Sequence, residues 1–298
     1  MVRRAPAAAR SVEILDFLAT HPGQHFTLTE IAGALEMNTA STLTVLHSLL
    51  DGGYVNRHPR RKTFALGPAL LVLGQSALAE YRSLELAIPE MRSLAADVGT
   101  EVALSVMAGT DMLVLRIEGK PRSSTNEMRA GARMPFAAPF GAVVAAWSTD
   151  EVVRDWLRRT FPIPSQLVID QVAANLGKIR ERGYSIGTDS DERARIAALM
   201  ERLIDTPGSR AVRDVIDNLM TRIAPTYLLD QVRADDRLDI SFVAAPVFGP
   251  DGVVLYEMAI IGLPRPCPGG ELLAVAERLK TTVSILTKVI GTGTQVQP

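Results

Sequence analysis

Seven basic side chains near the N-terminus are placed to neutralise the phosphates of a nucleic acid. Three lie among the first ten residues and four lie between residues 57 and 62; they are Arg3, Arg4, Arg10, Arg57, Arg60, Arg61 and Lys62. Clustered cations release counterions from a nucleic acid, which supplies most of the affinity that does not depend on sequence. Residues 1–66 carry seven Lys and Arg against five Asp and Glu, although the whole chain has a net charge of −1. A partner that carries phosphates is therefore expected at this end of the chain.

Hydroxyl and imidazole side chains lie between these two groups of cations. Their spacing predicts a helix whose apolar side runs from Leu43 to Leu50 and whose other side is free to face a DNA groove. The side chains expected on the groove-facing side are Thr39, Ser41, Thr42, Thr44 and His47. Such groups can contact phosphates, base edges or thymine methyls. Each of them alone is more simply a solvated surface side chain, so the interpretation depends on the neighbouring elements.

Three short helices and a hairpin are expected to position these side chains. Ser11 is expected to cap the first helix, and Thr27 with Glu30 has the spacing of a capping box for the second. The third helix is expected to begin at Thr39 or Ala40 and to stop at Gly52-Gly53. Two strands then flank the basic loop. This order of elements is that of a winged helix-turn-helix, and it favours double-stranded DNA as the partner.

At this point the segment resembles the DNA-binding domain of the IclR family of bacterial transcription factors. The resemblance lies in four stretches, at residues 10–15, 28–32, 49–55 and 64–68. It implies a regulator that binds an operator, and a repressor is the form that we expect. The chain departs from the family at Thr44, where a basic residue is usual. Since bidentate reading of guanine by Arg is lost there, we expect an unusual operator and more affinity from the arm and the wing.

The residues after the wing predict a linker helix. Gly67-Pro68 suits a helix start, and apolar residues then recur at three- and four-residue steps, at Leu70, Leu73, Ala77, Leu78, Tyr81 and Leu84. Pro89 is expected to begin a separate helix. The resemblance implies that the linker joins two domains and pairs between subunits, as a homodimer or homotetramer; a helix packed on its own domain is the alternative.

The rest of the chain alternates strands and helices, with hairpins expected at residues 101–118 and 240–261. It resembles the effector-binding domain of the same family, a fold related to GAF sensor domains. The expected fold is therefore α/β (α+β). Four segments are expected: a basic arm at 1–9, a winged helix-turn-helix at 10–67, a linker helix at 68–88 and an effector-binding domain at 89–298.

The resemblance also implies where a small-molecule effector would bind. The matching positions are Phe140, Gly141, Asp189, Phe242, Ala259 and Ile261. Most of them are apolar, and a buried anion without a partner is costly. We therefore expect a largely apolar effector, aromatic or terpenoid, rather than a small acid. The alternative is a pocket that is filled by the chain's own side chains.

One segment, residues 190–238, has no counterpart in the family. Fifty-five residues separate Tyr184 from Ile240, where the family has a short connection. Two apolar stripes at helical spacing, separated by Thr206-Pro207-Gly208-Ser209, predict a helical hairpin. Its role as a lid, an oligomer contact or a decoration is left open.

Other classes of function find little support in the sequence. There is no G-x-S-x-G motif and no phosphate-binding glycine loop, and all four histidines precede residue 59. The acidic residues Asp189, Asp191 and Glu192 are better explained as a solvated helix start than as a metal site. No enzyme activity, metal or cofactor is expected.

With a single cysteine, no signal peptide and no apolar run of about 18 residues, a cytoplasmic protein without a membrane partner is expected. The alternative function, suggested by Thr44, is a ligand-sensing or interaction protein that has lost specific DNA reading.

Overall fold

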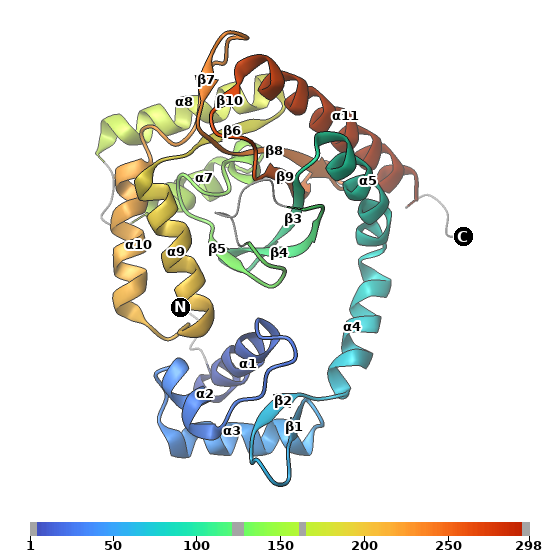
Figure 1. Cartoon of the computed structure of the whole chain (residues 1–298), viewed down its shortest axis with the longest axis vertical. Coiled ribbons are helices and arrows are strands. Elements are labelled where there is room, and N and C mark those ends of the chain that lie inside the picture. The colour runs from blue at the N-terminus through green and yellow to red at the C-terminus, as the bar shows by residue number, and fades with distance from the viewer. Residues whose placement is uncertain (1–4, 121–127, 161–164, 294–298) are drawn as a thin grey trace. The chain divides into compact units, whose positions relative to one another are not determined.

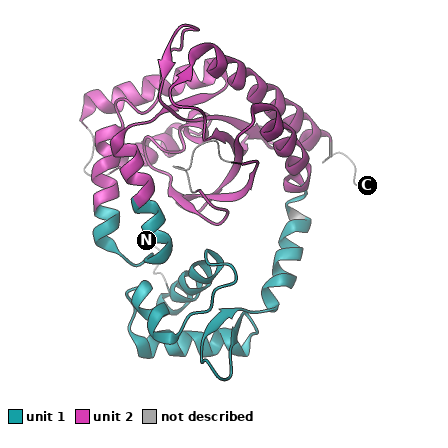
Figure 2. Ribbon diagram, viewed as in Figure 1, with its two compact units in different colours: residues 1–82, 199–214 teal, residues 83–198, 215–298 magenta. Residues whose placement is uncertain are grey.

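A computed structural model describes residues 5–120, 128–160 and 165–293 of the chain. It divides into two compact units, shown in Figure 2. Unit 1 comprises residues 1–82 and 199–214, and unit 2 comprises residues 83–198 and 215–298. Among the described helices, none combines the length and the hydropathy that crossing a membrane would require.

Unit 1 contains three helices followed by a two-stranded hairpin and a fourth helix (Figure 1). The helices are α1 (Pro6–Ala19), α2 (Leu28–Ala34), α3 (Thr39–Asp51) and α4 (Ala69–Glu80), and the strands are β1 (Val55–Arg57) and β2 (Phe64–Leu66). The strands pair antiparallel, with Asn56 opposite Ala65. Ile14, Ile31, Leu46 and Phe64 are among the buried side chains of one shared core. The predicted winged helix-turn-helix is confirmed.

The ends of α2 and α3 are fixed by side chains that accept hydrogen bonds from the backbone. The Thr27 hydroxyl accepts from the Glu30 amide at 3.3 Å, and the Glu30 carboxylate accepts from the Thr27 amide at 2.7 Å. The predicted capping box is therefore confirmed. Asn38 caps α3, because its Oδ1 accepts from the Ala40 amide at 2.9 Å. The helix accordingly begins at Thr39, as predicted.

The expected start of the first helix was wrong. α1 begins at Pro6, five residues before Ser11. Proline suits the first turn of a helix because the amide that it lacks would have no partner there. Ser11 lies inside the helix, and its hydroxyl donates to the Ala7 carbonyl at 3.1 Å. The helix therefore includes residues that were expected to belong to a flexible arm.

A close approach of two backbone segments connects the wing to α4. A Cβ atom at Gly67 would lie 2.2 Å from the carbonyl oxygen of Gly53, so only glycine fits. The Gly67 amide donates to the Tyr54 carbonyl at 2.7 Å, and the Ala69 amide donates to the Gly53 carbonyl at 3.2 Å. These contacts hold the end of the wing against the end of α3.

Unit 1 also includes residues 199–214, the turn of the inserted hairpin with the adjoining parts of its two helices. His21 Nε2 lies 3.0 Å from Asp205 Oδ1, and the Gly208 amide donates to the Ala34 carbonyl at 3.2 Å. His21 is itself buried between the rings of Phe17 and Phe26. The hairpin turn thus contacts the C-terminal ends of α1 and α2.

Unit 2 is built on a six-stranded sheet in the order β5-β4-β3-β9-β8-β6. Its strands are β3 (Glu101–Ala108), β4 (Asp111–Glu118), β5 (Arg133–Pro135), β6 (Ser185–Thr188), β8 (Ile240–Phe248) and β9 (Val254–Ile261). Every neighbouring pair is antiparallel. A second sheet pairs β7 (Arg237–Leu238) with β10 (Cys267–Pro268).

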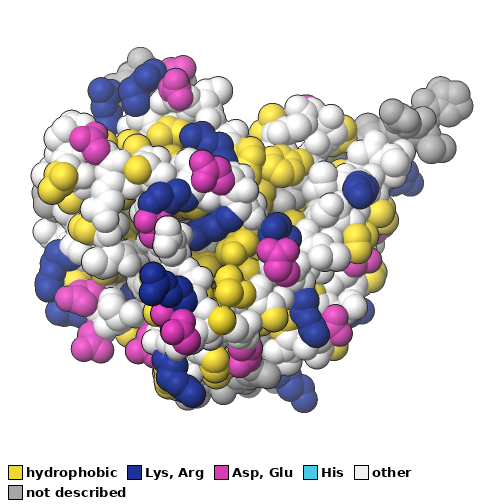
Figure 3. Space-filling model, turned by 90° about the horizontal axis from the view of Figure 1, so that it is seen from above, with side chains coloured by type: hydrophobic (Ala, Val, Ile, Leu, Met, Phe, Trp, Pro, Cys, Tyr) yellow, Lys and Arg dark blue, Asp and Glu magenta, His cyan; other side chains and the backbone are white. Residues whose placement is uncertain are grey.

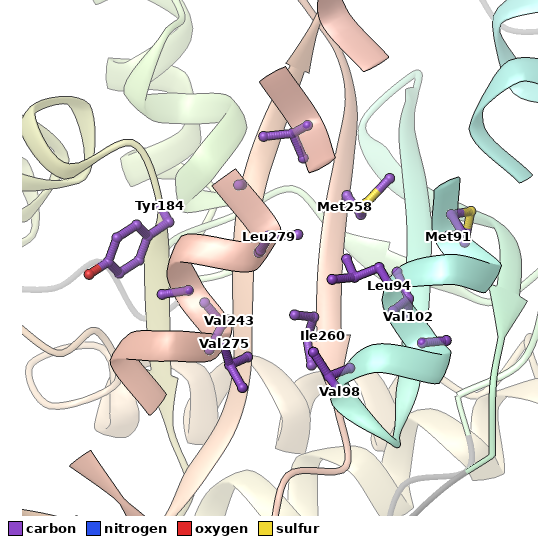
Figure 4. Close-up of a cluster of buried hydrophobic side chains, with 14 of the residues drawn as sticks. Met91, Leu94, Val98, Val102, Tyr184, Val243, Met258, Ile260, Val275 and Leu279 are labelled. Atoms are coloured by element: carbon purple, nitrogen blue, oxygen red, sulfur yellow. The ribbon is translucent and has the colours of Figure 1, made fainter. Parts of the chain in front are cut away.

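Two helices cover one face of the six-stranded sheet and form the main core. They are α5 (Arg82–Val98) and α11 (Gly269–Gly293). Figure 4 shows Leu94, Val243, Met258, Ile260 and Leu279 meeting between these helices and the strands. Because successive strand residues point to opposite faces, the residues between these core positions belong to the other face of the sheet.

The break between α4 and α5 falls at Tyr81 rather than at Pro89, where it was expected. Pro89 lies inside α5. Ala87, Met91 and Leu94 are buried on both sides of it, so packing on the sheet keeps the helix continuous despite one missing amide donor.

The other helices of unit 2 include α6 (Ala142–Ala146), α7 (Asp150–Arg158) and α8 (Gln166–Arg182). Every residue of α6 is buried, and α6 contacts β8 and β9. Trp156 on α7 is fully buried, and its Nε1 donates to the Phe140 carbonyl at 2.7 Å. The segment at 190–238 contains α9 (Asp191–Asp205) and α10 (Arg210–Ile223), so the predicted helical hairpin is confirmed.

Replacing Thr27 with alanine removes one half of the capping box and should lower the free energy of unfolding by about 1 kcal/mol. Urea denaturation of the full chain measures this. Thr281→Ala is the matched control, because Thr281 is an exposed residue inside α11 whose hydroxyl only donates back to Glu277. Equal effects of the two substitutions would contradict the role of the cap.

Candidate nucleic-acid interface and effector site

The exposed side of α3 differs from the expected one by a rotation of the helix. Thr42 is fully buried and its hydroxyl donates to the Asn38 carbonyl at 3.0 Å, so its expected place facing a groove was wrong. Leu43, which was expected inside, is 38% exposed, and Val45 is buried in its stead. The helix packs Val45, Leu46 and Leu49 inward, and this arrangement places the apolar atoms of Thr42 in the core.

Apart from Asp51 at its C-terminal end, the exposed side chains of α3 are hydroxyl, imidazole and aliphatic groups. Thr39, Ala40, Leu43, Thr44 and His47 are exposed, and Ser41 is half-buried. The Thr44 hydroxyl donates to the Ala40 carbonyl at 3.1 Å, which leaves its lone pairs as acceptors. Ala40 and Leu43 were not expected on this surface, yet aliphatic groups suit contact with a thymine methyl. No residue of α3 is Lys or Arg, so its surface has no donor suited to bidentate contact with guanine.

Arg10 lies on α1 and contacts the beginning of α3. Its Nη1 donates to the Ser41 hydroxyl at 2.7 Å. Arg10 therefore adds a cation beside the N-terminal end of α3 instead of belonging to a free arm. Arg3 and Arg4 lie outside the described residues.

The wing carries its cations on an ordered loop. Arg57, Arg60, Arg61 and Lys62 are exposed, and the Arg57 guanidinium lies 5.6 Å from the centre of the buried Phe64 ring. The His58 ring Nδ1 accepts from the Arg60 and Arg61 amides at 3.3 and 3.1 Å. On the face of the molecule drawn in Figure 3, by contrast, basic and acidic side chains are intermingled. The wing is thus a local concentration of positive charge.

In unit 2, two of the expected effector residues lie on either side of an aromatic ring that was not expected. Tyr227 is buried, and its ring centre is 5.2 Å from that of Phe140 and 5.7 Å from that of Phe242. Phe242 is opposite Ile261 in the β8–β9 pairing, and Gly187 on β6 is opposite Phe242. A Cβ at Gly187 would lie 2.0 Å from the Phe242 ring, so glycine leaves the space that this ring occupies.

The remaining expected effector residues have structural surroundings of their own. Gly141 precedes α6 with φ of 74°, and a Cβ there would meet the Phe136 ring and the Met112 sulfur at under 3 Å. Ala259 is half-buried on β9, opposite Ala103 and Ala244. The side chain of Asp189 is 5% exposed; it forms an ion pair with Arg265, and its Oδ1 lies 3.9 Å from Arg193 Nε. Binding of an effector by these positions stays a prediction.

Buried polar groups surround Tyr227, and the apolar surroundings expected from the sequence were therefore incomplete. Burial raises the pKa of the Tyr227 phenol to about 12, while the nearby Arg193 and Ser241 act in the opposite direction. The Ser241 hydroxyl is buried next to the phenol. A ligand that carries oxygen atoms would thus find donors and acceptors here.

Glu257 is a further ionisable group on this side of the sheet. It lies on β9 opposite Ser105 and Pro246, and it is buried. Burial raises its pKa from 4.5 to about 7, and no described residue forms an ion pair with it. Sequence reasoning missed Tyr227 and Arg193 because both lie at 190–238, the segment that was expected to have no counterpart in the family. The alternation Tyr256-Glu257-Met258 within a strand was the available signal for Glu257.

The raised pKa of Glu257 makes stability depend on pH. Its protonated form is favoured by the folded state, so this contribution is fully present below about pH 4.5 and is lost as pH rises through about 7. The free energy of unfolding of Glu257→Gln should therefore equal that of the wild type in acid. Above pH 7 it should be higher than that of the wild type, by up to about 3 kcal/mol. Denaturation curves between pH 4.5 and 8 measure the difference. Glu181→Gln, at an exposed position, is the control. If the difference in free energy of unfolding between Glu257→Gln and the wild type does not change with pH, the raised pKa of Glu257 is contradicted.

Comparison with known proteins agrees with the geometry of both units. Residues 7–59 match the IclR helix-turn-helix domain. The HTH-type transcriptional regulator BhcR of Paracoccus denitrificans is 26% identical over 256 residues, which are 80% of this chain and 84% of that protein. The acetate operon repressor of Salmonella typhimurium is 26% identical over 197 residues, which are 62% of this chain and 69% of that repressor.

Solved structures of low sequence identity share the fold. The IclR-type regulator of Alicyclobacillus acidocaldarius has a TM-score of 0.66 at 20% identity and covers 97% of this chain and 100% of its own. An IclR homologue of Microbacterium hydrocarbonoxydans in complex with 4-hydroxybenzoate has a TM-score of 0.63 at 16% identity, over 95% of this chain and 98% of its own. These relatives are regulators rather than enzymes. With the helix-turn-helix match, the fold and the relatives in agreement, the comparisons support an IclR-family transcriptional regulator with a DNA-binding helix-turn-helix.

Proposed function

We propose that this regulator is a repressor that binds its operator as a homodimer and responds to a small aromatic effector held in unit 2. Residues 10–67 would be the DNA-binding domain, 68–88 the linker and 89–298 the effector-binding domain. The proposal of DNA binding rests on one observation, the ordered wing with four exposed cations next to α3. Support for repression comes from relatives that are named repressors.

α3 and the wing have different roles in this proposal. α3 would enter the major groove with Thr39, Thr44 and His47, while the wing cations would contact phosphates. Because α3 contributes no Lys or Arg, most of the electrostatic affinity would come from the wing and from Arg10. The wing residues are thus the first place to test binding.

Removing two wing cations should weaken DNA binding for every sequence. In Arg60→Ala/Arg61→Ala, the plot of log affinity against log salt should become shallower by about one unit for each phosphate that the variant no longer neutralises. Fluorescence anisotropy with the chain's own upstream DNA measures this. Arg154→Ala/Arg158→Ala removes two exposed cations from α7 and should leave the slope unchanged. Undiminished affinity of the wing variant would refute the assignment.

The alternative is a ligand-sensing protein that has lost specific DNA reading, which is suggested by Thr44 at a position where a cation is usual. The same titrations separate the two functions. An unrelated duplex bound as tightly as the upstream region, at matched salt, favours the alternative.

A homodimer is proposed because α4 exposes a large apolar surface. Among its described side chains, Leu71, Val72 and Leu73 are 71, 64 and 51% exposed, and Leu78 is 44% exposed. A second copy of α4 would bury these groups, and two DNA-binding units would then reach two half-sites.

Charge on this surface should disrupt the dimer. Leu71→Glu/Leu78→Glu places two carboxylates one heptad apart on α4 and should reduce the mass measured by light scattering to that of a monomer. Leu167→Glu is the control, because Leu167 is 77% exposed on α8. If the α4 variant keeps the wild-type mass, the subunits pair through another surface.

The proposed effector carries an aromatic ring and an oxygen-bearing group. Phe140 and Phe242 provide edge and face contacts for a ring, and Arg193 and Ser241 provide polar partners. A terpenoid without oxygen would leave these buried polar groups unpaired. The homologue in complex with 4-hydroxybenzoate has the same fold and supports this chemical class.

A further inference from the structure

The side chain of Tyr227 lies between two of the residues that would hold an aromatic effector. We infer that Tyr227 is an internal ligand: the chain's own phenol occupies the effector position, and an external phenol must displace it to bind. The inference rests on the effector site proposed above. It gives the 190–238 segment a function, since Tyr227 lies just after α10.

The contacts of the Tyr227 ring are those of a bound aromatic molecule. The Phe140 ring meets it edge to face, with an interplanar angle of 89°, and the Phe242 ring is tilted by 46°. These two rings come from separate elements, the loop before α6 and the strand β8. Tyr227 comes from a third segment and its ring contacts both of them. Removing this ring would leave a cavity lined by the Phe140 and Phe242 rings.

The phenol hydroxyl lies among polar groups that a ligand oxygen would also use. Arg193 on α9 and Ser241 on β8 are close enough to affect the ionisation of Tyr227. Asp189 holds Arg193 in turn, at 3.9 Å from its Nε. Ser241 is 3% exposed, and its hydroxyl acts on the phenol as a hydrogen-bond partner, as Arg193 does. A ligand oxygen in the place of the phenol oxygen would meet the same two groups.

The backbone around Tyr227 is held to the sheet by few hydrogen bonds. The Thr188 amide and hydroxyl donate to the Tyr227 carbonyl at 2.8 and 3.3 Å, and the same hydroxyl donates to the Thr226 carbonyl at 2.9 Å. The Leu229 amide donates to the Ile186 carbonyl at 3.0 Å, and a single bridge joins Gly187 to Leu228. The segment lies at the edge of the sheet, beyond β6. Such a short attachment opens at a lower free energy than the interior pairing of β8 with β9. A phenol that competes for the site would therefore release this segment and alter the path of the chain out of α10.

The ligand class follows from the tyrosine side chain itself. It is a phenol with a small substituent para to the hydroxyl, since the Cβ of Tyr227 occupies that position. A tethered ligand has a high effective concentration, so the wild type should bind an external phenol weakly.

The test is rescue of a truncated site by the missing side chain. Tyr227→Ala keeps the Cβ and lacks the phenol group, so it should be stabilised by phenol, measured as a rise in melting temperature, and less by benzene, which lacks the hydroxyl. Its affinity for phenol, measured by calorimetry, should exceed that of the wild type by about tenfold or more. Tyr184→Ala, which truncates a buried tyrosine of the main core, is the control and should gain nothing. Equal affinity of Tyr227→Ala and the wild type would overturn the inference.

A second variant covers the case in which Tyr227→Ala does not fold. Tyr227→Phe keeps the ring and loses the hydroxyl, so 4-methylphenol should compete more easily and bind more tightly than to the wild type. Unchanged affinity for this variant also overturns the inference.

DNA binding, measured with and without the phenol, separates this inference from the proposed function. Tighter phenol binding by the variants without any change in DNA affinity supports the internal ligand and refutes the effector role of the site. The opposite result is also informative. If the phenol changes the DNA affinity of the wild type but the variants bind the phenol no more tightly, the effector role of the site is supported and the internal ligand is refuted.

Discussion

The alternation of side chains across the antiparallel pairs β3–β9–β8 is the constraint on which the rest of unit 2 depends. Val243, Met258 and Ile260 face α5 and α11 and form the main core. The intervening residues, such as Phe242, Glu257 and Ala259, must then belong to the other face. A one-residue slip would exchange the two sets and place Glu257 in the apolar core. Burial of the first face therefore fixes the chemistry of the second, where small residues leave room for aromatic rings.

Buried ionisable groups in unit 2 are tolerated in two different ways. Asp189 is paired with Arg265 and lies near Arg193, so its charge is compensated. Glu257 has no cationic partner among the described residues, and its raised pKa means that it sheds its charge instead. Arg193 lies near both Asp189 and Tyr227, so polar groups and aromatic rings meet at one place. Ordinary core packing would have filled this place with aliphatic side chains.

The sequence was sufficient where a local rule decides the structure. The Thr27 capping box, the start of α3 and the strand hairpins depend on neighbours within a few residues, and all were predicted. The rotation of α3 was not predicted, because Leu43 and Thr42 are both compatible with a helix and only packing within unit 1 selects Thr42 for burial. The site in unit 2 was predicted in part. Phe140 and Phe242 came from a family resemblance, whereas Tyr227 and Arg193 lie in a segment that no resemblance covers, and their contacts join residues far apart in the chain.

The roles proposed for α3 and the wing have a consequence for specificity. Phosphate contacts by the wing would be equally good on any sequence, so they would raise affinity without selecting an operator. Selection must come from α3, whose exposed side chains are short, and from the shape of the DNA itself. Thr44 and Leu43 can distinguish thymine through its methyl group, but each such contact discriminates less than a bidentate arginine does. An operator read in this way should be rich in A·T pairs, and its recognition should depend on two half-sites being bound together. If two subunits pair through α4 as proposed, its exposed apolar side would be as important for specificity as the recognition helix, because two bound half-sites would double the discrimination free energy that one copy supplies.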